Sequence, residues 1–189
     1  MTRIPEIIFL CGFSGSGKTE VGKILAQKLA FGYTDTDAEV EAALNRPIPE
    51  IFAKMGEHRF RSAEGDVVRM AIGQKRRVVS LGGGAIHDER MLEHLKANGY
   101  LVYLRTSPET IFERLLNSHF RPMLQAVARD EMSHRQAIIS RIARLLDERE
   151  PLYRQAHAMV TTDGKSIAEV VDEIETLIGQ PDSDEKIQR

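Results

Sequence analysis

A chain of 189 residues is long enough for one well-buried core and leaves little room for a second domain. Apolar residues make up 42% and charged residues 29%, as in ordinary soluble proteins, and no apolar run approaches the roughly 20 residues of a membrane helix. The 26 basic and 28 acidic side chains nearly cancel, so charge alone favours neither nucleic acid nor an anionic membrane as a partner. We therefore expect a soluble protein whose recognition sites are local.

Cysteine and histidine usage points to a chain without disulfides or structural zinc. Cys11 is the only cysteine, which excludes an internal disulfide and fits a reducing compartment. The six histidines have neither the HExxH spacing nor cysteine partners. The first five residues lack the charged, apolar and small-residue regions of a signal peptide. We expect a cytoplasmic protein.

Short apolar runs, each followed by a helical pattern, predict strands that alternate with helices. The runs are Ile7–Cys11, Val78–Leu81, Tyr100–Leu104 and, more weakly, Ala158–Thr161. Ser107 followed by Pro108 predicts a helix start, and Ser166 with Glu169 predicts a capping box. This alternation is typical of a parallel sheet covered by helices on both faces.

The remaining segments divide the chain into a core and its appendages. We expect residues 1–180 to form a single domain and the polar residues 181–189 to form a flexible tail. Between residues 117 and 134 the pattern loses any consistent period. That stretch is the best candidate for a mobile flap.

The segment GFSGSGKT joins the first predicted strand to a helix and matches G-x-x-x-x-G-K-[ST]. Its small residues let backbone N–H groups surround a phosphate chain, and the helix adds its N-terminal dipole. Lys18 would reach the β- and γ-phosphates, and the Thr19 hydroxyl would bind Mg²⁺. The expected nucleotide-binding residues are Gly12, Ser14, Gly15, Ser16, Gly17, Lys18 and Thr19. The motif predicts a nucleoside triphosphate with Mg²⁺ but not the acceptor, because GTPases, motors, transporters and small-molecule kinases share it.

Asp35 and Asp37 are the first candidates for the acceptor side. In extended backbone, two carboxylates two residues apart point the same way and can serve one cleft. Asp35 could hold Mg²⁺ directly or through water, while Asp37 faces a substrate hydroxyl. The alternative is a polar turn that caps a helix beginning near Ala38.

Arg61 and Glu64 lie three residues apart on a predicted helix, so the carboxylate can orient the guanidinium. An arginine held in this way suits bidentate capture of a substrate carboxylate. The alternative is an exposed ion pair of little consequence.

Three glycines, Gly82, Gly83 and Gly84, follow the strand at residues 78–81, at the end where ligands bind in open α/β sheets. Backbone without side chains lets a small polar molecule approach closely, although a plain loop is the alternative. Arg121 in the flap could close over a transferred phosphoryl group, and Arg149, at the end of a long helix, could be a second cation for the substrate. Taken singly, both could be ordinary surface arginines.

In this order, the segments resemble the shikimate kinase family over residues 7 to about 178. The motifs that match are GFSGSGKT, DTD at 35–37, G-E-x-x-F-R-x-x-E at 56–64, the glycines at 82–84, R-P at 121–122 and R-x-P-L-Y at 149–153. The P-loop is shared widely, but the other five motifs together are specific to the family.

The resemblance implies a three-layer αβα P-loop kinase fold with a five-stranded parallel sheet, a substrate-binding region at about 35–64 and a mobile lid at about 117–134. It also implies a monomer that uses ATP and Mg²⁺, with no nucleic-acid or membrane partner. The implied reaction phosphorylates the 3-hydroxyl of shikimate, giving 3-phosphoshikimate and ADP, a step towards chorismate and the aromatic amino acids.

The resemblance also assigns roles to individual residues. On the acceptor side, Asp37 would bind the ring hydroxyls and orient or deprotonate the attacking one, Arg61 and Arg149 would hold the carboxylate, and Gly83 with Gly82 and Gly84 would supply backbone contacts. On the donor side, Lys18 and Arg121 would stabilise the transferring phosphoryl group, Thr19 and Asp35 (through water) would serve Mg²⁺, and Arg114 would stack on adenine. The facing wall of the adenine pocket, expected in the loop at 161–165, has no recognisable match.

Two alternatives remain. Another small-molecule kinase of this fold, for gluconate or a nucleotide, is disfavoured by the joint presence of Asp37, Arg61, the glycine triplet and Arg149. A non-catalytic nucleotide-binding module is disfavoured because the phosphate-handling residues, including Lys18 and Arg121, are all in place.

Overall fold

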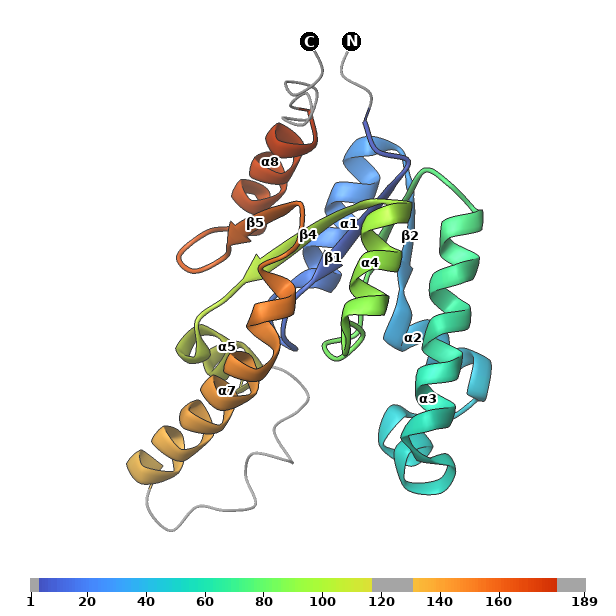
Figure 1. The fold of residues 1–189 in the computed structure, drawn as a ribbon. Helices are drawn as coiled ribbons and strands as arrows, with labels where there is room; N and C mark the ends of the chain where they lie inside the picture. Colours follow the sequence, from blue (N-terminus) through green and yellow to red (C-terminus); the bar gives the residue numbers. More distant parts are fainter. Residues whose placement is uncertain (1–3, 117–130, 180–189) are drawn as a thin grey trace.

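Five parallel strands form the centre of the molecule, in the order β2-β3-β1-β4-β5 (Figure 1). The computed structural model describes residues 4–116 and 131–179. The strands are β1 (Ile7–Cys11), β2 (Gly32–Asp35), β3 (Arg77–Ser80), β4 (Tyr100–Arg105) and β5 (Ala158–Thr161). The helices are α1 (Lys18–Leu29), α2 (Thr36–Leu44), α3 (Ile48–Gly73), α4 (Glu89–Asn98), α5 (Pro108–Leu116), α7 (Glu131–Tyr153) and α8 (Ile167–Ile178). The predicted alternation and the five-stranded parallel sheet are confirmed.

The sheet is buried on both faces because successive residues of β1 point to opposite sides. Phe9 and Cys11 pack with side chains of α3, α4 and the end of α7, whereas Ile8 and Leu10 pack with α1 and α8. The Cys11 thiol is buried, and burial raises its pKa to about 12. The three predicted layers are thus present, and Figure 1 shows α4 and α1 on opposite sides of the sheet.

The predicted helix caps form as expected. The Ser107 hydroxyl accepts a hydrogen bond from the Thr110 N–H, and α5 begins at Pro108. Ser166 and Glu169 form a reciprocal capping box at the start of α8. No helix within residues 4–116 and 131–179 is long and apolar enough to cross a membrane.

One local expectation is wrong. The chain is extended through Asp35 only, and α2 begins at Thr36, so Asp37 lies in the first turn of a helix. The cause is capping. The Asp35 carboxylate accepts hydrogen bonds from the N–H groups of Asp37 and Ala38, which favours a helix that begins directly after the strand. Asp35 and Asp37 therefore share one cleft as a cap and a first-turn residue, not as alternating residues of a strand.

Helices α2 and α3 form a small unit beside the sheet, within the region predicted to bind the substrate (Figure 1). They share a separate apolar cluster made of Val40, Ile51, Phe60, Ala63 and Val67. Helix α3 contains a break at Gly56, whose positive φ of 79° interrupts the helical path.

The predicted flap falls mostly outside the described residues. Residues 117–130, with Arg121 among them, and the predicted tail at 181–189 belong to the part of the chain that is not described. The last residues of the predicted flap, 131–134, are helical and open α7.

Candidate active site

A cavity of about 390 Å³ opens where the carboxyl ends of the central strands meet. Predicted residues from both sides of the reaction line it together: Ser14, Gly15, Gly17, Lys18, Thr19, Arg114, Asp35, Asp37 and Gly83. Gly12 and Ser16, the other predicted residues of the loop, are buried and are not part of this lining. Segments as far apart in the sequence as Ser14 and Arg114 therefore supply one cavity.

The phosphate-binding loop, residues 12–19, has a backbone that only glycine tolerates at its turning points. Gly12 has a φ of 143°, and a Cβ there would lie 2.7 Å from the carbonyl oxygen of Leu104. Gly17, directly before α1, has a φ of 93°. These left-handed conformations turn the loop into the start of the helix, where N–H groups without helical partners favour an anion.

Lys18 is buried at the floor of the loop. Its ammonium group donates hydrogen bonds to the carbonyl oxygens of Gly12 and Phe13, both at 2.9 Å. Burial lowers the pKa of Lys18 to about 8, against the attraction of Asp37. The loop thus holds a positive charge in place before any phosphate is bound.

Thr19 and Asp35 provide oxygen atoms at the same end of the cavity. The Thr19 hydroxyl donates to the Asp35 carboxylate at 2.9 Å. Oxygen donors of this kind suit Mg²⁺, which takes few protein ligands and completes its octahedron with phosphate oxygens and water. Within residues 4–116 and 131–179, no group of three or more His, Cys, Asp or Glu side chains could hold a metal ion by itself.

Asp37 projects from the first turn of α2 into the cavity lining. Burial, reinforced by repulsion from Asp35 and Glu64, raises the pKa of Asp37 from 3.8 to about 6, and Lys18 opposes this shift. The carboxyl group is still mainly ionised at neutral pH, so it can accept a hydrogen bond from a hydroxyl group.

Arg61 and Glu64 form a partly buried ion pair on α3. Arg61 Nη1 lies 2.7 Å from Glu64 Oε2, and the two side chains are 23% and 2% exposed. Burial raises the pKa of Glu64, although Arg61 stabilises its charged form. The alternative of an exposed ion pair therefore does not apply, and the carboxylate orients the guanidinium.

The glycine segment Gly82–Gly84 runs through the middle of the site, and its neighbours leave no room for side chains. A Cβ on Gly82 would collide with the Asp37 carboxylate, and one on Gly84 would lie 2.9 Å from Arg61 Nη2. A Cβ on Gly83 would lie 3.1 Å from the backbone nitrogen of Ser14 in the phosphate-binding loop. The segment thus touches both sides of the cavity.

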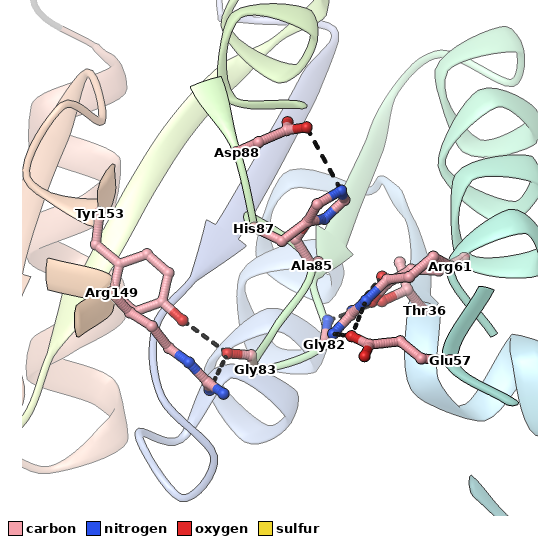
Figure 2. A network of polar contacts seen from close by, with 11 residues as sticks. Thr36, Glu57, Arg61, Gly82, Gly83, Ala85, His87, Asp88, Arg149 and Tyr153 are labelled. Atoms are coloured by element: carbon pink, nitrogen blue, oxygen red, sulfur yellow. Dashed lines mark hydrogen bonds and ion pairs between the residues drawn. The ribbon is translucent and has the colours of Figure 1, made fainter. Parts of the chain in front are cut away.

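Arg149 approaches the glycine segment from the side opposite Arg61 (Figure 2). Its Nη1 donates to the Gly83 carbonyl oxygen at 2.8 Å, and its guanidinium lies over the Phe13 ring, 5.4 Å from the centroid. Tyr153, one turn further along α7, donates to the same oxygen at 2.7 Å. The two predicted carboxylate-binding arginines therefore lie on either side of one strip of backbone.

Arg114 is held against both the phosphate-binding loop and the loop after β5. Its Nη1 lies 3.1 Å from the Ser16 carbonyl oxygen and 3.1 Å from Thr162 Oγ1, and its Nη2 lies 3.2 Å from the Thr162 carbonyl oxygen. Sequence reasoning did not identify Thr162, because only a contact across 48 residues gives it a role. Arg121, the remaining predicted arginine, lies outside the described residues.

Sequence comparison matches this chain to shikimate kinases. The family model described as shikimate kinase matches residues 14–178. A shikimate kinase from Chlorobium limicola is 41% identical over 173 residues, which cover 92% of this chain and 86% of that protein.

Solved structures agree with the sequence match. A shikimate kinase from Bacteroides thetaiotaomicron superposes with a TM-score of 0.82 at 29% identity, covering 93% of this chain and 99% of the other. One from Acinetobacter baumannii, solved in complex with shikimate, gives a TM-score of 0.80 at 34% identity, covering 99% of this chain and 97% of the other. The chain belongs to the shikimate kinase family.

Proposed function

We propose that this protein transfers the γ-phosphoryl group of ATP to the 3-hydroxyl of shikimate, giving 3-phosphoshikimate and ADP. The observation that carries the proposal is the single cavity lined by Lys18 of the phosphate-binding loop and by Asp37 and Gly83 opposite it. A donor phosphate held by the loop would thus lie beside the groups suited to a hydroxylated acceptor.

The acceptor groups suit the chemistry of shikimate, a small carboxylate with several hydroxyls. Arg61 and Arg149 supply cations on either side of the glycine segment, and the Glu64 carboxylate keeps Arg61 oriented. Arginine binds a carboxylate through two parallel hydrogen bonds, which fixes the position of the ring as well as its charge. Asp37 then accepts a hydrogen bond from the attacking hydroxyl.

Asp37 acts mainly by alignment. The transition state for phosphoryl transfer is loose, so positioning and charge stabilisation matter more than a strong base. A pKa of about 6 makes the Asp37 carboxylate a weak base for an alcohol. It orients the oxygen towards the γ-phosphorus and takes the proton as the new P–O bond forms.

Lys18, whose ammonium group is held by two loop carbonyls, would turn onto the β- and γ-phosphates when ATP binds. We propose that Arg121 also stabilises the negative charge that develops on the transferred phosphoryl group. Thr19, and Asp35 through water, are the residues that would hold Mg²⁺, and the ion would there neutralise phosphate charge. Arg114 would stack on adenine, with the loop at Thr162 beside it.

The same proposal includes a monomer with one kinase domain, residues 1–180, that works in the cytoplasm. The described lining of the cavity, with Lys18, Asp37 and Gly83, needs no residue from a second copy of the chain. Light scattering with and without substrates would test the monomer, and a stable dimer would contradict it.

A parallel assay tests the activity. ADP release is measured with shikimate, gluconate and nucleoside monophosphates as separate acceptors, in the presence of Mg²⁺ and after its removal with EDTA. We expect strong stimulation by shikimate alone, loss of activity with EDTA, and recovery when Mg²⁺ is restored. No stimulation by shikimate above the background without acceptor would overturn the proposal, and stimulation by gluconate would favour the sugar-acid alternative.

A further inference from the structure

We propose that the hydroxyl groups of Thr36 and Tyr153 are positioning groups that hold the Gly82–Gly84 backbone in its acceptor-binding orientation. This inference rests on the proposed function, because the role of the segment in binding shikimate belongs to that proposal. Neither hydroxyl would touch the substrate. Each would act through the peptide group to which it is hydrogen-bonded.

Thr36 holds the segment at its first glycine. The Gly82 N–H donates to Thr36 Oγ1 at 2.8 Å, and Thr36 is fully buried, at 0% exposure. Thr36 is also the first residue of α2, next to Asp37. One helical turn therefore presents the acceptor carboxylate and fixes the backbone beside it.

Tyr153 holds the segment at its second glycine, from the opposite side (Figure 2). Its hydroxyl donates to the Gly83 carbonyl oxygen at 2.7 Å, and the residue is 1% exposed. The ring packs against Tyr103, with the centroids 5.2 Å apart. Because Tyr153 projects from α7, the glycine segment is tied to a helix far from α2.

The Gly83 carbonyl oxygen is shared. Arg149 donates to it at 2.8 Å, so both lone pairs of this oxygen have a donor. This contact uses Arg149 Nη1 and leaves its other N–H groups for a carboxylate. In the part of the chain that is described, the N–H groups of Gly83 and Gly84 have no protein acceptor, so they too can serve the substrate.

A glycine segment needs such restraints more than other backbone does. Residues without a Cβ have the widest choice of φ and ψ, so fixing them costs the most conformational entropy. Here the Ala85 N–H donates to the Gly82 carbonyl at 3.0 Å and closes the turn, while the two hydroxyls fix its N–H and C=O groups from outside. Restraints formed before binding reduce the ordering that the substrate must impose.

Three variants test the proposal against a purely structural role. Tyr153→Phe and Thr36→Val each remove one hydroxyl and keep the shape of the side chain. Tyr103→Phe is the matched control, because Tyr103 is an equally buried tyrosine in the same apolar cluster, while among the described residues the Gly83 carbonyl receives its hydrogen bonds from Arg149 and Tyr153. Thr36→Ser keeps the hydroxyl and serves as the rescue variant.

We expect the KM and the calorimetric Kd for shikimate to rise about tenfold in Tyr153→Phe and in Thr36→Val, as for the loss of one hydrogen bond to a buried group. The KM for ATP should stay within about twofold of wild type, and Thr36→Ser should recover most of the shikimate affinity. Tyr103→Phe should leave both KM values unchanged. If Tyr153→Phe and Thr36→Val lower only the Tm and keep the wild-type KM for shikimate, the positioning role is refuted.

Hydrogen exchange of the amides in residues 81–86, measured without substrate, separates this inference from the proposed function. Exchange should be faster in Tyr153→Phe and Thr36→Val than in wild type and Tyr103→Phe. Wild-type protein that fails to phosphorylate shikimate would refute the proposed function. Active wild type combined with unchanged exchange and unchanged KM in both variants would refute this inference alone.

Discussion

The two sides of the cavity are built in different ways. The centre of the donor side is one continuous segment, residues 12–19, whose shape comes from backbone turns at glycine, and Arg114 of α5 is held against it. The acceptor side takes Asp37 from α2 and Gly83 from the loop after β3, and Arg61 of α3 and Arg149 of α7 lie against the same glycine segment. A segment that is local in sequence keeps its form in many proteins, whereas groups brought together by packing can change with the substrate.

The charges on the two sides also differ. The donor side holds one buried cation, Lys18, whereas the acceptor side combines the carboxylates of Asp37 and Glu64 with the guanidinium of Arg61. Changes to Lys18 should therefore affect mainly the rate of transfer. Acceptor-side changes should affect shikimate binding, pH dependence and stability together.

Lys18→Met is expected to have the largest effect. Removing the cation at the transferred phosphoryl group should lower kcat by roughly a thousandfold. Stability should not fall, because burial already disfavours the charged form of Lys18. Single-turnover kinetics and thermal unfolding would measure both, and a kcat within tenfold of wild type would contradict the role of Lys18.

Asp37→Asn is expected to have the second largest effect, and it tests whether Asp37 acts on the acceptor and not on ATP. The amide keeps the shape but accepts hydrogen bonds poorly, so kcat should fall roughly a hundredfold while the Kd for ATP stays within about twofold. Isothermal calorimetry with ATP supplies the control. An equal loss of ATP affinity would place Asp37 on the donor side.

The raised pKa of Asp37 also predicts that activity and stability change in opposite directions with pH. Because the pKa of Asp37 is raised from 3.8 to about 6, the folded protein binds more protons there than the unfolded chain between these values. The contribution of Asp37 to the free energy of unfolding is thus present at low pH and is lost as the pH rises through about 6. Activity needs the ionised form, so kcat/KM should fall as the pH drops below about 6. Asp37→Asn should therefore raise the free energy of unfolding at pH near 8 by about 1 kcal/mol, and chemical denaturation at a series of pH values would show whether it does.

Arg61→Leu should have an intermediate effect that combines binding and folding. The KM for shikimate should rise about thirtyfold, and the unpaired Glu64 should lower the free energy of unfolding by about 2 kcal/mol. The double variant Arg61→Leu/Glu64→Leu removes the buried charge as well. It should recover stability but not shikimate affinity, and recovery of both would mean that Arg61 has only a structural role.

Arg114→Ala should have the smallest effect and should be confined to the donor side. Loss of a cation over adenine should raise the KM for ATP about fivefold. The KM for shikimate, measured at saturating ATP, should not change. A similar rise in both values would show that Arg114 supports the whole cavity through Ser16 and Thr162 and does not act at the base alone.

The same contrast explains how much could be predicted from the sequence. Four of the five strands, the helix caps and the phosphate-binding loop were predicted because apolar runs, capping residues and glycine turns act within a few neighbours, whereas β2 has no such apolar run. The sequence did not predict that Asp37 is helical. The Asp35 side chain caps α2, so the helix begins at Thr36, directly after the strand. Thr162 and Tyr153 gain their contacts only across 48 and 70 residues, and no local pattern reveals such partners.

The buried Cys11 makes this protein convenient for spectroscopic labelling. Its thiol lies at the end of β1 with a pKa of about 12, so maleimide reagents, which need an accessible thiolate, should leave it unmodified. Arg59 on α3 and Glu148 on α7 are both exposed, and cysteines introduced at these positions could carry a dye pair without removing the native thiol. Changes in energy transfer between the dyes would then report whether α3 and α7 approach each other as each substrate binds.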